Sequence, residues 1–153
     1  MTFCVQADFA LRHRSNGTPE TGSRAPNDPV EFRNSLISWY LKHCRNLPWR
    51  EEPSPYRIWV SEAMLQQTQV STVIPYYRRF ILKYPDVACL AAADTEDVLK
   101  AWEGLGYYAR ARNLHRAARR VCQDHGGCVP DTYAAFRSLP GVGDYIAAAV
   151  LSI

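Results

Sequence analysis

A tight turn built on two glycines, Leu139-Pro140-Gly141-Val142-Gly143, joins two stretches of helical pattern near the end of this 153-residue chain. Glycines on both sides of one apolar residue let the chain reverse sharply, and Val142 then fills the space between the helices. The first N–H groups of the second helix lack intrahelical acceptors and suit an anion such as a DNA phosphate. We therefore predict a hairpin that holds a nucleic-acid backbone at Gly141, Val142 and Gly143 without reading sequence. An ordinary connection between helices is the alternative.

Charge gives this prediction limited support. The net charge of +3 is too small to establish a nucleic-acid partner, although fifteen of the eighteen cationic residues are arginine, whose planar fork suits phosphate. One helix concentrates them without an intervening acid: Arg110, Arg112, Arg116, Arg119 and Arg120, together with His115. We interpret this helix as a second contact surface, with a solvated helix face as the alternative. Asp144 would repel a phosphate unless it points away or caps the helix.

The rest of the chain also has a helical pattern. Apolar residues recur at spacings of three and four, and no segment alternates with the period of a strand. The expected helices cover residues 30–46, 56–67, 70–83, 108–124 and 132–139, and a last helix starts at Asp144. A further short helix is opened by Asp94 with Asp97 and closed by Gly104. Pro75 should start or kink a helical segment, and Asp131 should cap helix 132–139. We predict an all-α fold.

The ends and the cysteines add further expectations. Residues 15–29 are rich in Ser, Gly, Pro and Asn, so we expect residues 1–29 to be a disordered extension. Five scattered cysteines form no CxxC pair, which favours reduced thiols and predicts no metal site. No apolar run approaches the ~18 residues that span a bilayer. We expect no membrane contact and a cytoplasmic, nucleoid-associated location in a bacterium, or a nuclear or mitochondrial one in a eukaryote.

Three blocks of sequence precede the hairpin and carry a family resemblance. They are LPWR at 47–50, WVSEAMLQQTQ at 59–69 and GLGYYARARNL at 104–114. In this order they closely resemble the adenine DNA glycosylases of the MutY type, within the helix-hairpin-helix glycosylase superfamily, over about residues 30–153. The resemblance implies a six-helix barrel for 47–153 and a second lobe to which helix 30–46 belongs. It also implies a monomer that hydrolyses the N-glycosidic bond of adenine mispaired with 8-oxoguanine or guanine in double-stranded DNA.

Particular residues match the motifs of that family. Glu62 matches the catalytic glutamate, and partial burial on its apolar helix would raise its pKa toward that of a proton donor; an exposed or ion-paired glutamate is the alternative. The pocket for a flipped adenine matches Trp49, Arg50, Leu65 and Tyr145. Gln66 and Gln67 match DNA-contacting positions, with Gln67 inserted into the duplex. Tyr107 matches an aromatic wedge beside the opposing oxidised guanine, with core packing as the alternative.

The resemblance also implies parts that residues 1–153 do not contain. A catalytic aspartate and a four-cysteine run that binds a 4Fe–4S cluster fall beyond Ile153, and the chain stops within a helical pattern. We therefore expect an incomplete domain with no cofactor of its own and little glycosylase activity. A non-catalytic DNA-binding fragment is one alternative.

The second alternative is an enzyme like endonuclease III, which acts on damaged or mismatched pyrimidines. Those enzymes carry a Schiff-base lysine two residues after the last glycine of the hairpin, where this chain has Tyr145. We therefore favour a glycosylase without a lysine-dependent lyase step.

Overall fold

The computed structural model describes residues 28–152, so the expected disordered extension lies almost wholly outside the described residues. Helices and turns make up this part of the chain, without a strand, and the all-α prediction is confirmed. The chain divides into two units, residues 1–44 and 45–153. None of the helices within residues 28–152 combines the length and apolarity needed to cross a membrane.

The described part of the first unit is a single helix, α1 (Pro29–His43). It begins where Asp28 Oδ1 accepts a hydrogen bond from the Val30 amide at 2.9 Å, with proline in the first helical position. It ends earlier than the predicted residue 46, because Cys44 is already extended. Its large apolar side chains are 45–69% exposed: Val30, Phe32, Leu36, Ile37, Trp39, Tyr40 and Leu41. The assignment of this helix to a second lobe stays a prediction.

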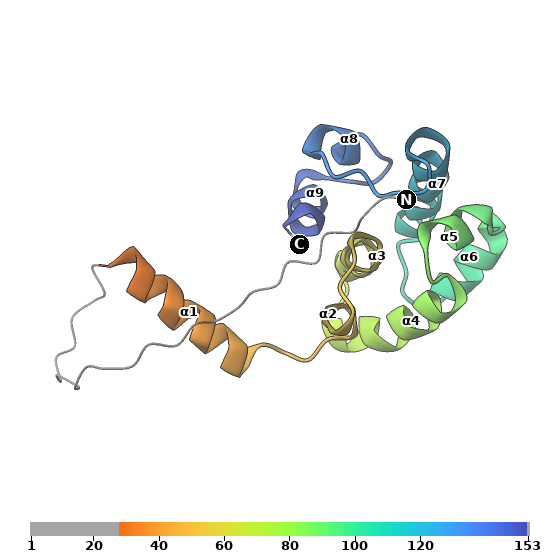
Figure 1. Cartoon of the computed structure of the whole chain (residues 1–153). Coiled ribbons are helices and arrows are strands. Elements are labelled where there is room, and N and C mark those ends of the chain that lie inside the picture. The colour runs from red at the N-terminus through yellow and green to blue at the C-terminus, as the bar shows by residue number, and fades with distance from the viewer. Residues whose placement is uncertain (1–27, 153) are drawn as a thin grey trace. The chain divides into compact units, whose positions relative to one another are not determined.

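The described part of the second unit contains the remaining helices. They are α2 (Pro48–Glu51), α3 (Pro55–Leu65), α4 (Val70–Lys83), α5 (Val87–Ala92), α6 (Thr95–Trp102), α7 (Ala109–His125), α8 (Tyr133–Arg137) and α9 (Asp144–Leu151). Helix α3 is apolar nearly all round and lies between the α8–α9 pair and the group formed by α5, α6 and α7, with α4 along another side (Figure 1). The segment that carries Glu62 is thus the central helix of this unit.

Large aromatic side chains hold the helices around α3. Trp59 packs edge-on against Phe136 of α8 with ring centroids 5.3 Å apart, and Phe80 of α4 packs edge-on against Trp102 of α6 at 5.9 Å. All four rings are almost completely buried. Burying rings of this size contributes much of the apolar stabilisation of such a unit.

Helix α3 ends differently from the sequence prediction, whereas α4 has the predicted bounds. Helix α3 stops at Leu65 instead of residue 67, because Gln66 leaves the helical conformation and Gln67 has a positive φ. Helix α4 spans 70–83 as predicted and contains Pro75 within it. The helical pattern therefore locates both segments, but it does not predict the conformation of the turn between them.

Caps were predicted less well than helices. Asp94 occupies the N-cap of α6, but its side chain makes no capping hydrogen bond, and Thr132, not Asp131, occupies the N-cap of α8. Helix α5 was not predicted, since six residues are too few to show a periodic pattern. Its start is defined by Asp86 Oδ1, which accepts from the Cys89 amide at 2.7 Å.

Candidate nucleic-acid interface and active site

The hairpin between α8 and α9 has the predicted geometry. Val142 is buried between the helices, and its amide donates to the Leu139 carbonyl at 3.1 Å to close the turn. Gly141 has φ +75, and a Cβ built on it would lie 2.6 Å from the Cβ of Asn113 in α7. Glycine is therefore required at 141 both by the backbone conformation and by the close approach of α7.

At the N-terminus of α9, the side chain of Asp144 is bound by residues of α8. Gly143 is the N-cap and has no capping side chain. Asp144 Oδ1 accepts from Arg137 Nε at 2.6 Å and from the Tyr133 hydroxyl at 2.8 Å, while Arg137 Nη1 donates to the Val142 carbonyl at 2.9 Å. These bonds lower the pKa of Asp144 and pair its charge with α8. The expected repulsion of a phosphate is thus reduced.

Glu62 lies on α3 facing α9. Its side chain is half-buried, and burial raises its pKa because desolvation disfavours the ionised carboxylate. Tyr145 of α9 donates a hydrogen bond to this carboxyl, which opposes part of the rise. Two residues predicted to belong to the site are therefore brought together from different helices, and Glu62 has the environment expected of a proton donor.

Two exposed residues at the edge of this unit have strained backbones. Gln67, between α3 and α4, has φ +57, and Tyr107, before α7, has φ +49. Among residues 28–152 these are the two non-glycine residues with positive φ, a conformation that costs on the order of 1–2 kcal/mol. Tyr107 is 63% exposed, so its ring is not part of the core. Such strain is typical of functional sites, where surrounding contacts maintain it.

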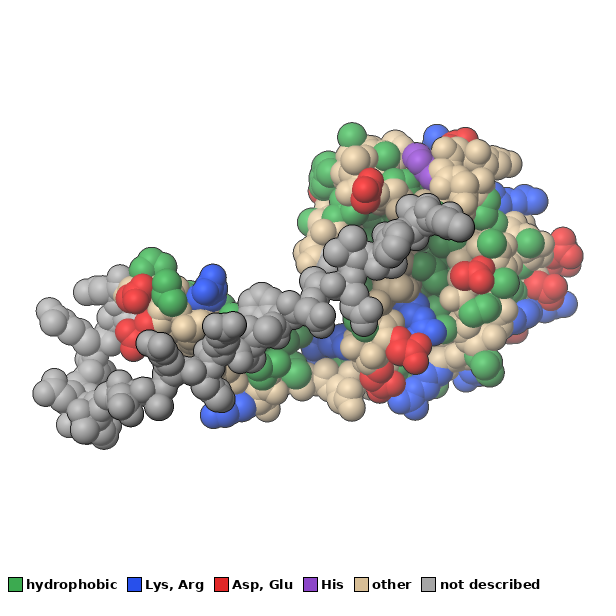
Figure 2. All heavy atoms as spheres, in the orientation of Figure 1, with side chains coloured by type: hydrophobic (Ala, Val, Ile, Leu, Met, Phe, Trp, Pro, Cys, Tyr) green, Lys and Arg blue, Asp and Glu red, His purple; other side chains and the backbone are tan. Residues whose placement is uncertain are grey.

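Arg110 connects the two strained turns, and the sequence prediction assigned it differently. It was expected to be part of a second contact surface, but its guanidinium binds backbone oxygens of both turns. His115 is also buried instead of exposed. The exposed arginines of the helix are Arg112, Arg116, Arg119 and Arg120. On the face shown in Figure 2, basic and acidic side chains of this unit are interspersed and no purely basic surface is visible.

The remaining residues predicted for the adenine pocket lie in α2 and at the end of α3. Trp49 in α2 is 4% exposed and packs edge-on against Tyr77, with ring centroids 5.2 Å apart. Arg50 is exposed and donates to the Arg45 carbonyl at 3.4 Å. Leu65, at the end of α3, packs partly against the core. Trp49 therefore requires a rearrangement before it can touch a base.

The hairpin and the turn after α3 line one small hollow of about 30 Å³. It is bounded by Gln66, Arg110, Asn113, Pro140 and Gly141, with apolar residues of α3 and α7 beneath. Gln66 is exposed at the end of α3 and lines this hollow together with Pro140 and Gly141, so this DNA-contact candidate adjoins the hairpin. The structure thus brings together predicted residues that are far apart in the sequence.

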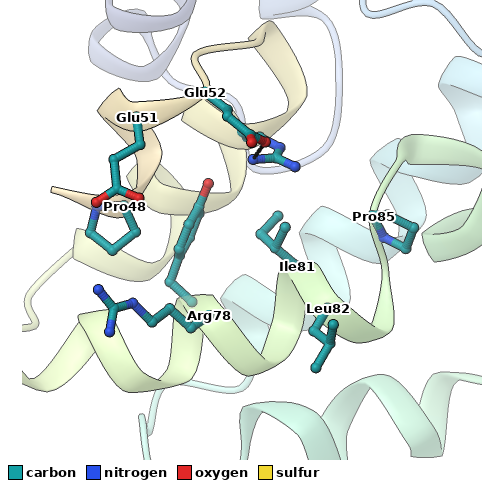
Figure 3. A pocket seen from close by; sticks show the side chains of 9 residues that line it. Pro48, Glu51, Glu52, Arg78, Ile81, Leu82 and Pro85 are labelled. Atoms are coloured by element: carbon teal, nitrogen blue, oxygen red, sulfur yellow. Dashed lines mark ion pairs between the residues drawn. The ribbon is translucent and has the colours of Figure 1, made fainter.

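A larger hollow of about 390 Å³ contains none of the predicted site residues. Figure 3 shows Glu51, Glu52, Arg78 and Leu82 around it, with an ion pair of 2.5 Å between Glu52 and Arg57. It opens between α2, α3 and α4, and its lining mixes both charges with apolar groups. Size alone therefore does not identify the site in this unit.

The described cysteines do not provide a set of ligands for an iron–sulfur cluster. Cys44, Cys89, Cys122 and Cys128 are free thiols, and within residues 28–152 no three His, Cys, Asp or Glu side chains come together to hold a metal ion.

Known proteins similar to this chain agree with the geometry. Residues 60–148 match the model of the HhH-GPD superfamily base excision DNA repair proteins. The adenine DNA glycosylase of Rattus norvegicus is 47% identical over 135 residues, which cover 82% of this chain and 26% of the relative. That of Mycobacterium tuberculosis is 43% identical over 131 residues, covering 85% and 41%. The chain thus spans 26% and 41% of the length of these two relatives.

Solved structures share the fold. A thermostable thymine-DNA glycosylase superimposes with a TM-score of 0.72 at 32% identity, covering 80% of this chain and 57% of that one. A trapped endonuclease III–DNA covalent intermediate gives 0.67 at 20% identity, covering 81% and 59%, a likeness of fold alone. More than half of the chain matches the family model, and the all-helical fold agrees with it. The chain belongs to the HhH-GPD superfamily of base excision DNA repair proteins.

Proposed function

We propose that this protein removes adenine mispaired with 8-oxoguanine or guanine by hydrolysing the N-glycosidic bond. The observation that carries the proposal is the environment of Glu62, a half-buried carboxyl with a raised pKa on a helix that packs against α9, which follows the hairpin. Cleavage of a purine nucleoside needs a proton at the departing base, and a carboxyl whose pKa is raised retains that proton nearer to neutral pH. The adenine specificity is supported by relatives such as the 47% identical rat adenine DNA glycosylase.

DNA is held, in this proposal, by backbone groups on one side and inserted side chains on the other. The N-terminus of α9 binds a phosphate, while Gln66 and Gln67 contact the duplex and Tyr107 enters beside the opposing base. The exposure and positive φ of Gln67 and Tyr107 support this role. The flipped adenine then lies near Glu62, Leu65 and Tyr145.

Trp49 and Arg50 complete the proposed pocket. For Trp49 the proposal requires its ring to become accessible when a base enters, because it now packs against Tyr77. Fluorescence quenching of tryptophan on addition of a mispaired duplex, compared between the native protein and W49F, would report this change.

The decisive variant is Glu62→Gln, which keeps the shape but cannot supply the proton. In the full-length protein we expect single-turnover excision of adenine opposite 8-oxoguanine to fall by roughly 10²–10⁴-fold with duplex binding kept. Glu96→Gln, an exposed glutamate of α6, serves as the matched control and should excise normally. Excision by E62Q within about twofold of the native rate would refute the proposal.

We further propose that a polypeptide of residues 1–153 by itself binds DNA but excises little adenine. The family resemblance requires a second carboxylate to stabilise the sugar cation, and that aspartate falls outside these residues. Near-native single-turnover excision by this polypeptide would contradict the expectation.

A pyrimidine substrate is the second candidate, favoured by the 32% identity to a thymine-DNA glycosylase. Excision assays on duplexes with T·G and A·8-oxoguanine pairs separate the two functions. We expect release of adenine and no strand cleavage, since Tyr145 stands where a lyase lysine would act.

A further inference from the structure

The guanidinium of Arg110 joins the end of α3 to both strained turns. Nη1 donates to the Ala63 carbonyl at 3.3 Å, to the Met64 carbonyl at 2.8 Å and to the Gln66 carbonyl. The carbonyl groups of Ala63 and Met64 belong to the last turn of α3, where intrahelical donors are lacking, and Gln66 directly follows the helix. Arg110 Nη1 thus supplies a hydrogen-bond donor to the carbonyl groups at the C-terminal end of the helix that carries Glu62.

The other end of the fork reaches the turns themselves. Nη2 donates to Thr68 Oγ1, to the Leu105 carbonyl and to the Gly106 carbonyl, each at 3.2 Å. Thr68 directly follows Gln67, and Gly106 directly precedes Tyr107. The two non-glycine residues with positive φ, Gln67 and Tyr107, therefore adjoin atoms that bind a single guanidinium.

Aromatic rings hold Arg110 in this position. Its Cζ lies 5.6 Å from the ring centroid of Trp102 and 5.4 Å from that of Tyr107, and Trp102 Nε1 donates to the Gly106 carbonyl at 3.2 Å. Arg110 thus contacts Tyr107 through its ring as well as through the turn that orients it. The side chain is only partly accessible, which makes a direct role in holding phosphate secondary.

We propose that Arg110 is a positioning residue that holds Gln67 and Tyr107 in a fixed mutual geometry for insertion into the mispaired duplex. This inference rests on the proposed function, which makes these two side chains the inserted groups. Arginine is needed because the donors of its planar guanidinium reach both turns at once, whereas the donors of a lysine ammonium all lie on one nitrogen atom. A purely structural cap of α3 would affect stability, but it would not make recognition of the mispair depend on Gln67 and Tyr107.

A double-mutant cycle in the full-length protein tests the coupling. The variants are R110K, the doubly truncated Q67A/Y107A, and their combination. Arg79→Lys is the matched control, because Arg79 is an exposed arginine of α4 that lies over Tyr76. The readout is the ratio of dissociation constants for an undamaged duplex and a duplex with non-cleavable 2′-fluoroadenosine opposite 8-oxoguanine.

We expect R110K to lower this discrimination ratio about tenfold while affinity for undamaged duplex stays within about twofold. In the Q67A/Y107A background the same change should alter the ratio less than about twofold, because the groups it positions are gone. An undiminished ratio in R110K, or an equal loss in both backgrounds, overturns the inference. If Q67A/Y107A itself leaves the ratio unchanged, the proposed insertion fails, and the inference fails with it for that separate reason.

Thr68→Val supplies a milder variant in case R110K does not fold. Valine keeps the shape of threonine and removes one acceptor of the Arg110 fork at the turn after α3. We expect a loss of discrimination of about threefold that disappears in the Q67A/Y107A background. Fluorescence of 2-aminopurine placed beside the 8-oxoguanine should fall in parallel, since insertion unstacks that base. A T68V protein with native discrimination and native fluorescence would overturn the inference.

Discussion

The Arg137 guanidinium donates to Asp144 Oδ1 at 2.6 Å, and this pair turns the one carboxylate at the start of α9 toward α8. Arg137 also donates to the Val142 carbonyl at 2.9 Å, so the same side chain supports the hairpin turn. A nonspecific phosphate site made of backbone N–H groups needs low negative charge nearby. Arg137 therefore affects both the conformation of the hairpin turn and the negative charge beside it.

Replacing Arg137 with methionine should weaken binding to undamaged duplex several-fold at low salt. Asp144 then keeps its charge without a cation, close to the expected phosphate. Asp144→Asn in the R137M background should restore part of the affinity, which separates this effect from a direct phosphate contact of Arg137. Titrations at two salt concentrations measure both; an R137M/D144N protein that binds no better than R137M would contradict the argument.

Tyr145→Phe should raise the pKa of Glu62 further. Burial raises this pKa, and the hydrogen bond from Tyr145 lowers it, so removing the hydroxyl leaves burial unopposed. Titration of the Glu62 carboxyl carbon by NMR measures the change, and the alkaline limb of excision by the full-length protein should move the same way. Tyr133→Phe, which loses a hydroxyl bonded to Asp144, is the control and should leave Glu62 unaffected. A lower Glu62 pKa in Y145F would refute this account.

The two hairpin glycines should respond differently to alanine. Gly141→Ala places a Cβ 2.6 Å from Asn113 Cβ at a positive φ, so we expect at least about 2 kcal/mol of destabilisation and a Tm lower by at least about 5 °C. Gly143 has φ −88, and no atom lies within 4 Å of a Cβ there, so G143A should keep its Tm within about 2 °C. Calorimetry compares them.

Gly143→Ala then tests the phosphate site without unfolding the chain. A methyl group at the start of α9 should hinder a DNA backbone that approaches the N–H groups, and affinity for undamaged duplex should fall. Native affinity in a stably folded G143A protein would place the phosphate elsewhere.

His115 should make stability depend on pH below about 6.5. It is buried on α7 with Nδ1 3.3 Å from Thr95 Oγ1, and burial together with Arg119 lowers its pKa, partly offset by the backbone of residues 91 and 93 and by Asp94. A lowered pKa means that the unfolded chain takes up the proton first as the pH falls. Stability is thus complete above about pH 6.5 and decreases below it.

Thermal unfolding at pH 7.5 and pH 5.5 measures this effect. The native chain should lose more Tm over this range than His115→Gln, whose side chain does not titrate. An equal loss of Tm in both proteins would assign the pH dependence to other groups.

The sequence by itself determined the features that depend on neighbouring residues. Helical periodicity located α4, α7 and α9, and the GVG turn predicted the reversal at Gly141, because these features follow from local backbone preferences. The apolar neighbours of Glu62 correctly predicted that its pKa is raised. The roles of Trp49, Arg50, Leu65, Gln66, Gln67, Tyr107 and Tyr145 come from resemblance, and they stay predictions.

Only the tertiary structure decided how distant parts act on one another. The direction of Asp144 depends on Arg137 and Tyr133 in the preceding helix, and the carbonyl groups where α3 ends are bound by Arg110, which lies on α7. In the sequence Arg110 looks like its exposed arginine neighbours. Its partial burial becomes visible only when the helices pack, because a guanidinium goes inward where several carbonyl groups converge without other donors. The hairpin with which the sequence argument began is therefore held from outside by α7 and α8, through contacts that its own five residues do not specify.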